Sequence, residues 1–178
     1  MEKATAILIN RTRLTETSLI VHWCSREHGL IKTVAKGARR PGSPLAGRLD
    51  LFYEAEIEYT PAKKGDLHTL REISVTDYRH GLQASYRRVL AASYFVRLVE
   101  LVSEKETPIE TLFDLLQRGL NWLCAQEPTL KGILHFEREL AKTLGLWSET
   151  DPAAPLQAIQ DLYHKVPEQR LPLLESLS

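Results

Sequence analysis

Residues 37–43 have the glycine spacing of a loop that binds nucleotide phosphates. The run Gly-Ala-Arg-Arg-Pro-Gly-Ser begins at Gly37 and ends at Ser43. A phosphate-binding loop of this kind carries a lysine directly after its second glycine, where the ammonium group reaches the β- and γ-phosphates. Here Ser43 and Pro44 follow that glycine, so the group that would contact these phosphates is missing. The sequence therefore argues against nucleotide hydrolysis.

No other set of residues has the spacing of an enzymatic or metal site. The chain lacks the G-x-S-x-G turn of serine hydrolases, and its six histidines form no H-E-x-x-H pair. Its two cysteines, Cys24 and Cys124, lie far apart, in neither a disulfide framework nor a zinc-ligand spacing. Asp161 and His164 share a helical spacing, but two isolated ligands are usually a solvated pair. We therefore expect a non-enzymatic protein with no cofactor and no metal.

Positive charge is concentrated in residues 26–48. This stretch has six basic side chains and one acidic side chain, in a chain with 23 of each. Glycines within it let the backbone approach a ligand closely, and cationic donors on an adaptable loop are typical of phosphate contacts. A second turn adds two lysines. The predicted DNA-contacting residues are Arg26, Lys32, Lys36, Arg39, Arg40, Arg48, Lys63 and Lys64.

Two other interpretations stay open for these residues. A basic loop can simply be a solvated turn, in which case the protein is an interaction adaptor that binds peptides rather than DNA. Proteins that bind single strands also place aromatic rings under the bases. Phe52 is a candidate for that role because it interrupts a polar strand face, and Trp23 is a weaker one because it is more typical of a core.

The first part of the chain has the alternation of β-strands. Residues 49–60 are the clearest case, with apolar or aromatic side chains at odd positions and mostly acidic ones at even positions. Four further runs predict strands at residues 4–10, 18–24, 30–36 and 67–75. Five short strands without a crossover helix predict a small antiparallel barrel, of which the OB-fold is the five-stranded form. We expect this barrel over residues 1–79.

The period changes to that of helices near residue 81. Thr107, Pro108 and Glu110 have the spacing of an N-cap, a first-turn proline and a capping-box glutamate, so a helix is predicted to begin there. A further helix is predicted from Thr129 to Gly145. The fold class is therefore α+β, with an all-α helical domain over residues 80–178.

Two details of the helical domain are predicted less directly. Glu137 falls on the apolar stripe of the helix that starts at Thr129, and we expect it at the edge of that stripe. Residues 156–164 have the pattern of one more short helix, whereas the signals after Pro167 are weak.

Several segments resemble the RecO family of recombination mediators. Residues 25–30 and 35–40 are similar to the family's T-x-E-x-G-L and A-K-G-A-R-R segments, and residues 16–21 match its E-T-S-L-I-V strand. Residues 65–72 resemble its G-x-L-x-T-L-x-E hairpin. The resemblance covers residues 4 to about 145 in the same order. It departs from many members after Leu146, where no cysteine of their four-cysteine zinc module is present, so we expect no zinc module.

The resemblance implies a function in DNA repair. It implies binding to single- and double-stranded DNA, strand annealing, and, together with RecR, loading of RecA onto DNA coated by single-strand-binding protein. We further expect the helical domain to bind the acidic, apolar C-terminal tail of single-strand-binding protein, with Arg88, Arg97 and Arg118 as nearby cations. The chain has no apolar run long enough for a membrane helix, so the expected location is the cytoplasm, at the nucleoid.

Overall fold

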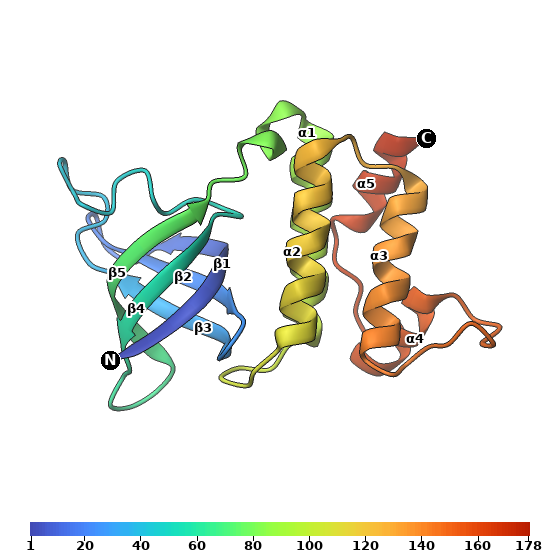
Figure 1. Ribbon diagram of the computed structural model, residues 1–178, viewed down its shortest axis with the longest axis horizontal. Helices are drawn as coiled ribbons and strands as arrows, with labels where there is room; N and C mark the ends of the chain where they lie inside the picture. The colour runs from blue at the N-terminus through green and yellow to red at the C-terminus, as the bar shows by residue number, and fades with distance from the viewer. The chain divides into compact units, whose positions relative to one another are not determined.

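A computed structural model describes residues 1–178, and the chain divides into two compact units (Figure 1). The barrel unit contains residues 1–79 and 103–110, and the helical unit contains residues 80–102 and 111–178. No helix in either unit is both long and apolar enough to cross a membrane.

The barrel unit is a closed five-stranded barrel with the strand order β1-β2-β3-β5-β4. All neighbouring strands are antiparallel except β3 and β5, which are parallel. The strands are β1 (Glu2–Arg13), β2 (Leu19–Ser25), β3 (Gly29–Ala35), β4 (Glu54–Thr60) and β5 (Leu67–Asp77). The predicted fold class, an OB-type barrel followed by helices, is confirmed.

Strand β4 is shorter than the sequence pattern predicts. It begins at Glu54, and residues 49–53 form a turn with Phe52 in the left-handed region at φ 71°. The Phe52 N–H donates to the Leu8 carbonyl at 2.8 Å, and the Leu8 N–H donates to the Tyr53 carbonyl at 2.9 Å. These two bonds attach the turn to β1. Leu49 still packs into the barrel core, but Leu51 is exposed and Phe52 is buried, so the alternating pattern of the strand ends at the turn.

Residues 103–110 lie in sequence between two helices but pack on the barrel. Strand β5 pairs with β3 only from Lys32 onward, so the first residues of β3 lack a neighbour on that side. The backbone of Glu104 and Glu106 takes this place, because the Leu30 N–H donates to Glu104 and the Glu106 N–H donates to Leu30. Lys105 then forms an ion pair with Asp66 at 2.8 Å.

This attachment also corrects one predicted helix start. Helix α2 begins at Glu110 rather than at Pro108, because the Ile109 N–H donates to the Arg26 carbonyl on the barrel at 3.3 Å. The Thr107 hydroxyl donates to the Lys105 carbonyl at 3.2 Å. The predicted capping box is therefore wrong.

The helical unit has a short 3₁₀ turn and five α-helices. They are the 3₁₀ turn His80–Ala84, α1 (Tyr86–Val102), α2 (Glu110–Ala125), α3 (Leu130–Thr143), α4 (Pro155–Tyr163) and α5 (Arg170–Leu177). Helix α3 begins next to Thr129, as predicted, and the Thr129 hydroxyl caps it by accepting the Gly132 N–H at 3.1 Å. Phe95 of α1 stacks on Phe136 of α3 with ring centroids 3.8 Å apart. Gly119 of α2 leaves room for these rings, since a Cβ there would lie 2.9 Å from Phe136.

Glu137 is buried rather than at the edge of the apolar stripe, so that prediction is wrong. Its side chain is 2% exposed, accepts the Tyr94 hydroxyl at 2.6 Å and forms an ion pair with Arg170 at 2.8 Å. The bond to Glu137 is the main reason that the pKa of Arg170 is raised above its ordinary value. A buried carboxylate needs such partners to offset its lost hydration. Arg170 thereby anchors α5 to α3.

Replacing Gly29 with alanine should destabilise the barrel unit by about 2–3 kcal/mol. Gly29 has φ 67°, and a Cβ there would lie 2.2 Å from the Thr107 carbonyl oxygen, so backbone strain and a clash add together. Gly42→Ala is the matched control, because Gly42 has φ 72° with nothing within 4 Å and should cost only about 1 kcal/mol. Urea unfolding followed by circular dichroism measures both. Equal losses would show that residues 103–110 do not pack tightly on β3.

Replacing Arg170 with methionine should destabilise the helical unit by about 3 kcal/mol, because it leaves the Glu137 carboxylate buried without its cation. Arg97→Met is the control, because Arg97 pairs with Glu100, whose side chain is 30% exposed and stays hydrated when its cation is lost, so the change should cost about 1 kcal/mol. Thermal unfolding compares the two variants. A loss as small as that of Arg97→Met would contradict the anchoring role of Glu137.

Candidate nucleic-acid interface

The long connection between β3 and β4 is built from consecutive tight turns. Backbone N–H groups donate three residues back from Arg40 to Gly37, from Ser43 to Arg40 and from Ala46 to Ser43, at 3.0–3.1 Å. Gly37, Gly42 and Gly47 all have φ near 70°, a region that glycine occupies without strain. The connection is therefore an ordered loop that carries its basic side chains at defined positions.

This loop packs on the turn between β1 and β2. The Arg39 N–H donates to the Thr17 carbonyl at 2.9 Å, and the Gly37 N–H donates to the Ser18 hydroxyl at 3.2 Å. Arg11 donates to the Leu49 carbonyl at 2.6 Å. We call residues 11–18 and 36–50 together the basic end of the barrel. They hold six basic and two acidic side chains.

Four of the eight predicted contact residues lie at the basic end. Lys36, Arg39, Arg40 and Arg48 are all exposed. Arg48 donates to the Ile73 carbonyl at 3.4 Å, which holds its side chain along β5. Acidic side chains do not neutralise Lys36, Arg39 or Arg40, whereas most other basic residues of the barrel form ion pairs. The loop thus concentrates unneutralised positive charge.

The other four predicted residues lie elsewhere on the barrel. Lys63 and Lys64 are exposed in the turn between β4 and β5, and Arg26 lies in the turn between β2 and β3. Because β3 and β5 are parallel, both turns lie toward the end where these strands begin, away from the basic end. Lys32 lies on β3, 3.9 Å from Asp66. The structure therefore separates the predicted residues into two groups.

Asp66 reduces the positive charge between these groups. Its hydrogen bond to Lys105 lowers the pKa of the Asp66 carboxyl, and the nearby Lys32 lowers it further. The carboxylate consequently stays charged at neutral pH and partly neutralises Lys32. Lys32 is therefore a weaker candidate for phosphate contact than the loop residues.

Two basic residues of this end were absent from the predicted set. Arg11 and Arg13 lie on the last part of β1, where their side chains are exposed. They are two positions apart and therefore project from the same face of the strand. Arg11 forms an ion pair with Asp50 at 3.1 Å, whereas Arg13 reaches only Glu16, at 4.0 Å. The Arg-x-Arg spacing just before a turn was the sequence signal for them.

Neither aromatic candidate is available for stacking on a base. Phe52 is 6% exposed, so it covers the barrel rather than offering a ring face to solvent. Trp23 is fully buried in the barrel core, as expected for the weaker of the two candidates. Its indole N–H donates to the Thr33 hydroxyl at 2.9 Å.

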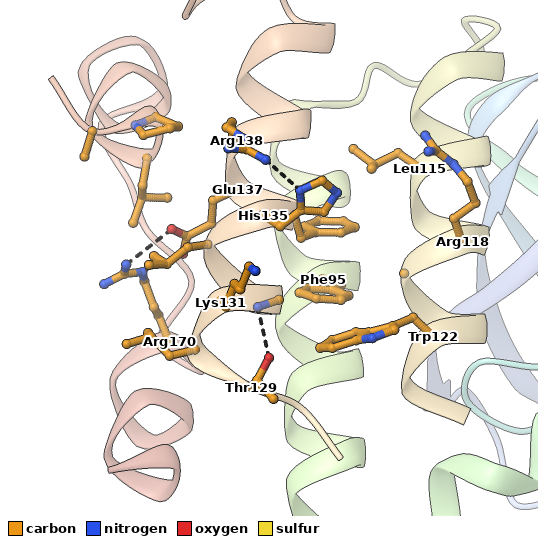
Figure 2. A pocket seen from close by; sticks show the side chains of 18 of the residues that line it. Phe95, Leu115, Arg118, Trp122, Thr129, Lys131, His135, Glu137, Arg138 and Arg170 are labelled. Carbon is orange, nitrogen blue, oxygen red and sulfur yellow. Dashed lines mark hydrogen bonds and ion pairs between the residues drawn. The ribbon is translucent and has the colours of Figure 1, made fainter. Parts of the chain in front are cut away.

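The helical unit contains a groove of about 1000 Å³ (Figure 2). Trp122 of α2 and Leu130 and Leu134 of α3 provide accessible apolar surface, whereas Phe95 and Leu115 also line the groove but are buried. Among the arginines predicted to flank an apolar site, only Arg118 lines the groove. Lys131 and Arg138 of α3 also line it. Apolar walls with several cations suit a ligand that is both apolar and acidic.

The other two predicted arginines have structural contacts instead. Arg88 donates to the Gly81 and Cys124 carbonyls at 3.0 and 2.9 Å and pairs with Glu127 at 2.8 Å. Arg97 pairs with Glu100 one turn further along α1. Neither residue lines the groove.

The structure contains no cluster of three or more His, Cys, Asp or Glu side chains that could hold a metal ion. The features described here that could bind a ligand are the basic end, the turn that carries Lys63 and Lys64, and the groove of the helical unit.

Comparison with known proteins identifies both units. The sequence family described as Recombination protein O N terminal matches residues 1–79, and the one described as Recombination protein O C terminal matches residues 83–154. These matches include the basic end and most residues of the groove.

Curated relatives agree with the family match. The chain is 36% identical to the DNA repair protein RecO of Cyanothece sp. over 121 residues, which are 68% of this chain and 41% of the relative. It is 32% identical to the RecO of Actinobacillus pleuropneumoniae over 78% of this chain and 56% of the relative. With Rhodopirellula baltica RecO it shares 29% over 79% of this chain and 52% of the relative. The chain spans about half the length of the curated relatives it matches. On these matches and on its barrel-and-helices fold, the chain belongs to the RecO family.

Proposed function

We propose that this protein is a non-enzymatic recombination mediator in DNA repair that binds single- and double-stranded DNA through the basic end of its barrel. The observation that carries the proposal is the set of exposed cations Lys36, Arg39 and Arg40, which no acidic side chain neutralises. Phosphate contacts from such residues release counterions and supply affinity for any nucleic-acid sequence. They position the protein on the backbone without reading bases, as strand annealing requires.

The two groups of basic residues suggest that a bound DNA strand follows β3. Strand β3 runs from the turn that carries Arg26 to the loop that begins at Lys36, and its seven residues span roughly 20 Å. The strand 2–3 face of an OB-fold is the surface that commonly binds oligonucleotides. A DNA strand on this face would pass Lys32 and reach Lys63 and Lys64 near the beginning of β3.

The groove of the helical unit is the proposed site for the C-terminal tail of single-strand-binding protein. An acidic, apolar tail needs a hydrophobic pocket for its side chains and cations for its carboxylates. Trp122 and Leu134 supply the hydrophobic surface, and Arg118 and Lys131 supply the cations.

We further propose, on the resemblance to the family, that the protein cooperates with RecR in loading RecA onto DNA coated by single-strand-binding protein. The proposed place of action is the cytoplasm, at the nucleoid. A titration with single-stranded DNA with and without RecR tests this cooperation, and we expect a further complex only when both are present.

Alanine at Lys36, Arg39, Arg40 and Arg48 together should weaken DNA binding and flatten its salt dependence. Each lost phosphate contact on single-stranded DNA lowers the slope of log affinity against log salt by about 0.7, so four contacts lower it by roughly 3. Fluorescence anisotropy with labelled oligonucleotides at several salt concentrations measures the slope. The loss should be similar for all base sequences, because phosphates carry no base identity.

Arg87→Ala with Lys165→Ala is the control, since both side chains are exposed in the helical unit and outside the basic end. This variant should bind DNA with nearly the wild-type slope. A folded quadruple variant with unaltered affinity and slope would move the site to Lys63 and Lys64. If the wild-type protein itself bound no DNA, the adaptor function would replace the mediator function.

Arg118→Glu should weaken binding of the isolated tail peptide of single-strand-binding protein by about fivefold or more. Arg118 is exposed, and an exposed ion pair contributes up to about 1 kcal/mol, which is a factor of about five in affinity. Arg87→Glu introduces the same charge change outside the groove and should leave the affinity nearly unchanged. Isothermal titration calorimetry measures both. Deleting the tail from single-strand-binding protein without any loss of affinity would refute the site.

A further inference from the structure

Two tyrosines lie together where β4 begins and β5 ends. Tyr53 directly precedes β4 and Tyr78 directly follows β5, and the register pairs the adjacent residues Glu54 and Asp77. The two rings meet edge to face, with centroids 4.9 Å apart and planes at 78°. Tyr78 is 40% exposed, so the pair offers aromatic surface to solvent.

Buried contacts fix the backbone on both sides of this pair. Tyr53 is attached to β1 by the Leu8 N–H at 2.9 Å. Next to Tyr78, the buried side chain of Arg79 donates to the Phe52 carbonyl at 2.7 Å and pairs with Glu54 at 2.5 Å. A pair held in this way loses little conformational freedom when a ligand binds.

The tyrosine pair adjoins the basic end. The Tyr53 N–H donates to the carbonyl of Asp50, the last residue of the basic end, at 3.3 Å, and the Asp50 carboxylate pairs with Arg11 at 3.1 Å. Arg11 also contacts the Leu49 carbonyl, at the end of the basic loop. Aromatic surface and phosphate-binding charge thus lie side by side.

Neither tyrosine belongs to the set of side chains that fills the barrel core, whereas Tyr59 does. Proteins that bind single strands combine a cationic surface with aromatic rings on which unpaired bases stack. Bases inside a duplex already stack on each other and have no free face to offer. Accepting the DNA-binding function proposed above, we propose that Tyr53 and Tyr78 form a stacking platform for an unpaired base of a strand bound at the basic end.

The platform predicts that Tyr78→Ala weakens binding to single-stranded DNA selectively. Affinity for a fluorescein-labelled oligo(dT) should fall about tenfold, the effect of one lost base stack. Affinity for a duplex of the same length and the salt slope should stay unchanged, because the phosphate contacts remain. Tyr78→Trp should retain the single-strand affinity. Tyr86→Ala is the control, since Tyr86 is 74% exposed on the helical unit and should have no effect.

Photocrosslinking tests the same contact in the unmodified protein. An oligonucleotide carrying 5-iodouracil couples on irradiation to an aromatic side chain stacked on it, and mass spectrometry should locate the adduct at Tyr78 or Tyr53. The corresponding duplex should give no such adduct. This measurement decides the matter if Tyr78→Ala fails to fold.

Three results would overturn the platform. They are equal losses for single strands and duplex in Tyr78→Ala, a Tyr78→Trp variant as weak as Tyr78→Ala, and crosslinks only at other residues. If these occurred while the loop quadruple variant still lost affinity, DNA binding would stand and the platform alone would fall. Absence of DNA binding by the wild-type protein would refute both.

Discussion

Closure of the barrel depends on β1, because this strand alone pairs with both β2 and β4. Residues 2–7 of β1 pair with β4 and residues 6–13 pair with β2, and the pairing with β2 has a register shift between Leu8 and Asn10. The backbone of Leu8 also receives the turn at Phe52. Through Arg11, β1 also contacts Leu49 at the end of the basic loop, and through Leu8 it holds Tyr53, so the candidate interface depends on the placement of this strand.

Charge in this protein acts through its distribution rather than its total. Acidic and basic residues are equal in number, yet most cations form ion pairs or contact carbonyl groups, as Lys105 and Arg88 do. Lys36, Arg39 and Arg40 are exceptions at the basic end, and Arg118 lines a groove with apolar walls. Each unit therefore carries its own candidate site, one suited to a polyanion and one suited to an acidic, apolar segment.

The sequence predicted what local patterns determine and missed what distant contacts determine. The start of α3 near Thr129 was predicted because a helix start depends on local residues, and here Thr129 caps the helix within four residues. Glu137 was misjudged because its cation comes from Arg170, in a tail with weak helical signals. Strand β4 was extended to residue 49 because Leu49 continues the alternation while packing from a turn. The predicted contact residues were grouped by sequence proximity, whereas the parallel pairing of β3 with β5 sends Arg26 toward the opposite end from Lys36.

The return of residues 103–110 to the barrel has a consequence for the order of folding during synthesis. All five strands have been made once Asp77 is added, but the segment that completes the start of β3 follows only after the whole of α1. At bacterial translation rates this interval lasts roughly 2–6 s, far longer than the formation of a hairpin. Until then the backbone of Leu30 is open to solvent or to a passing chain. The nascent protein therefore exists for seconds as a barrel in which the start of β3 lacks a hydrogen-bonding partner. Residues 103–110, from the second half of the chain, then supply that partner.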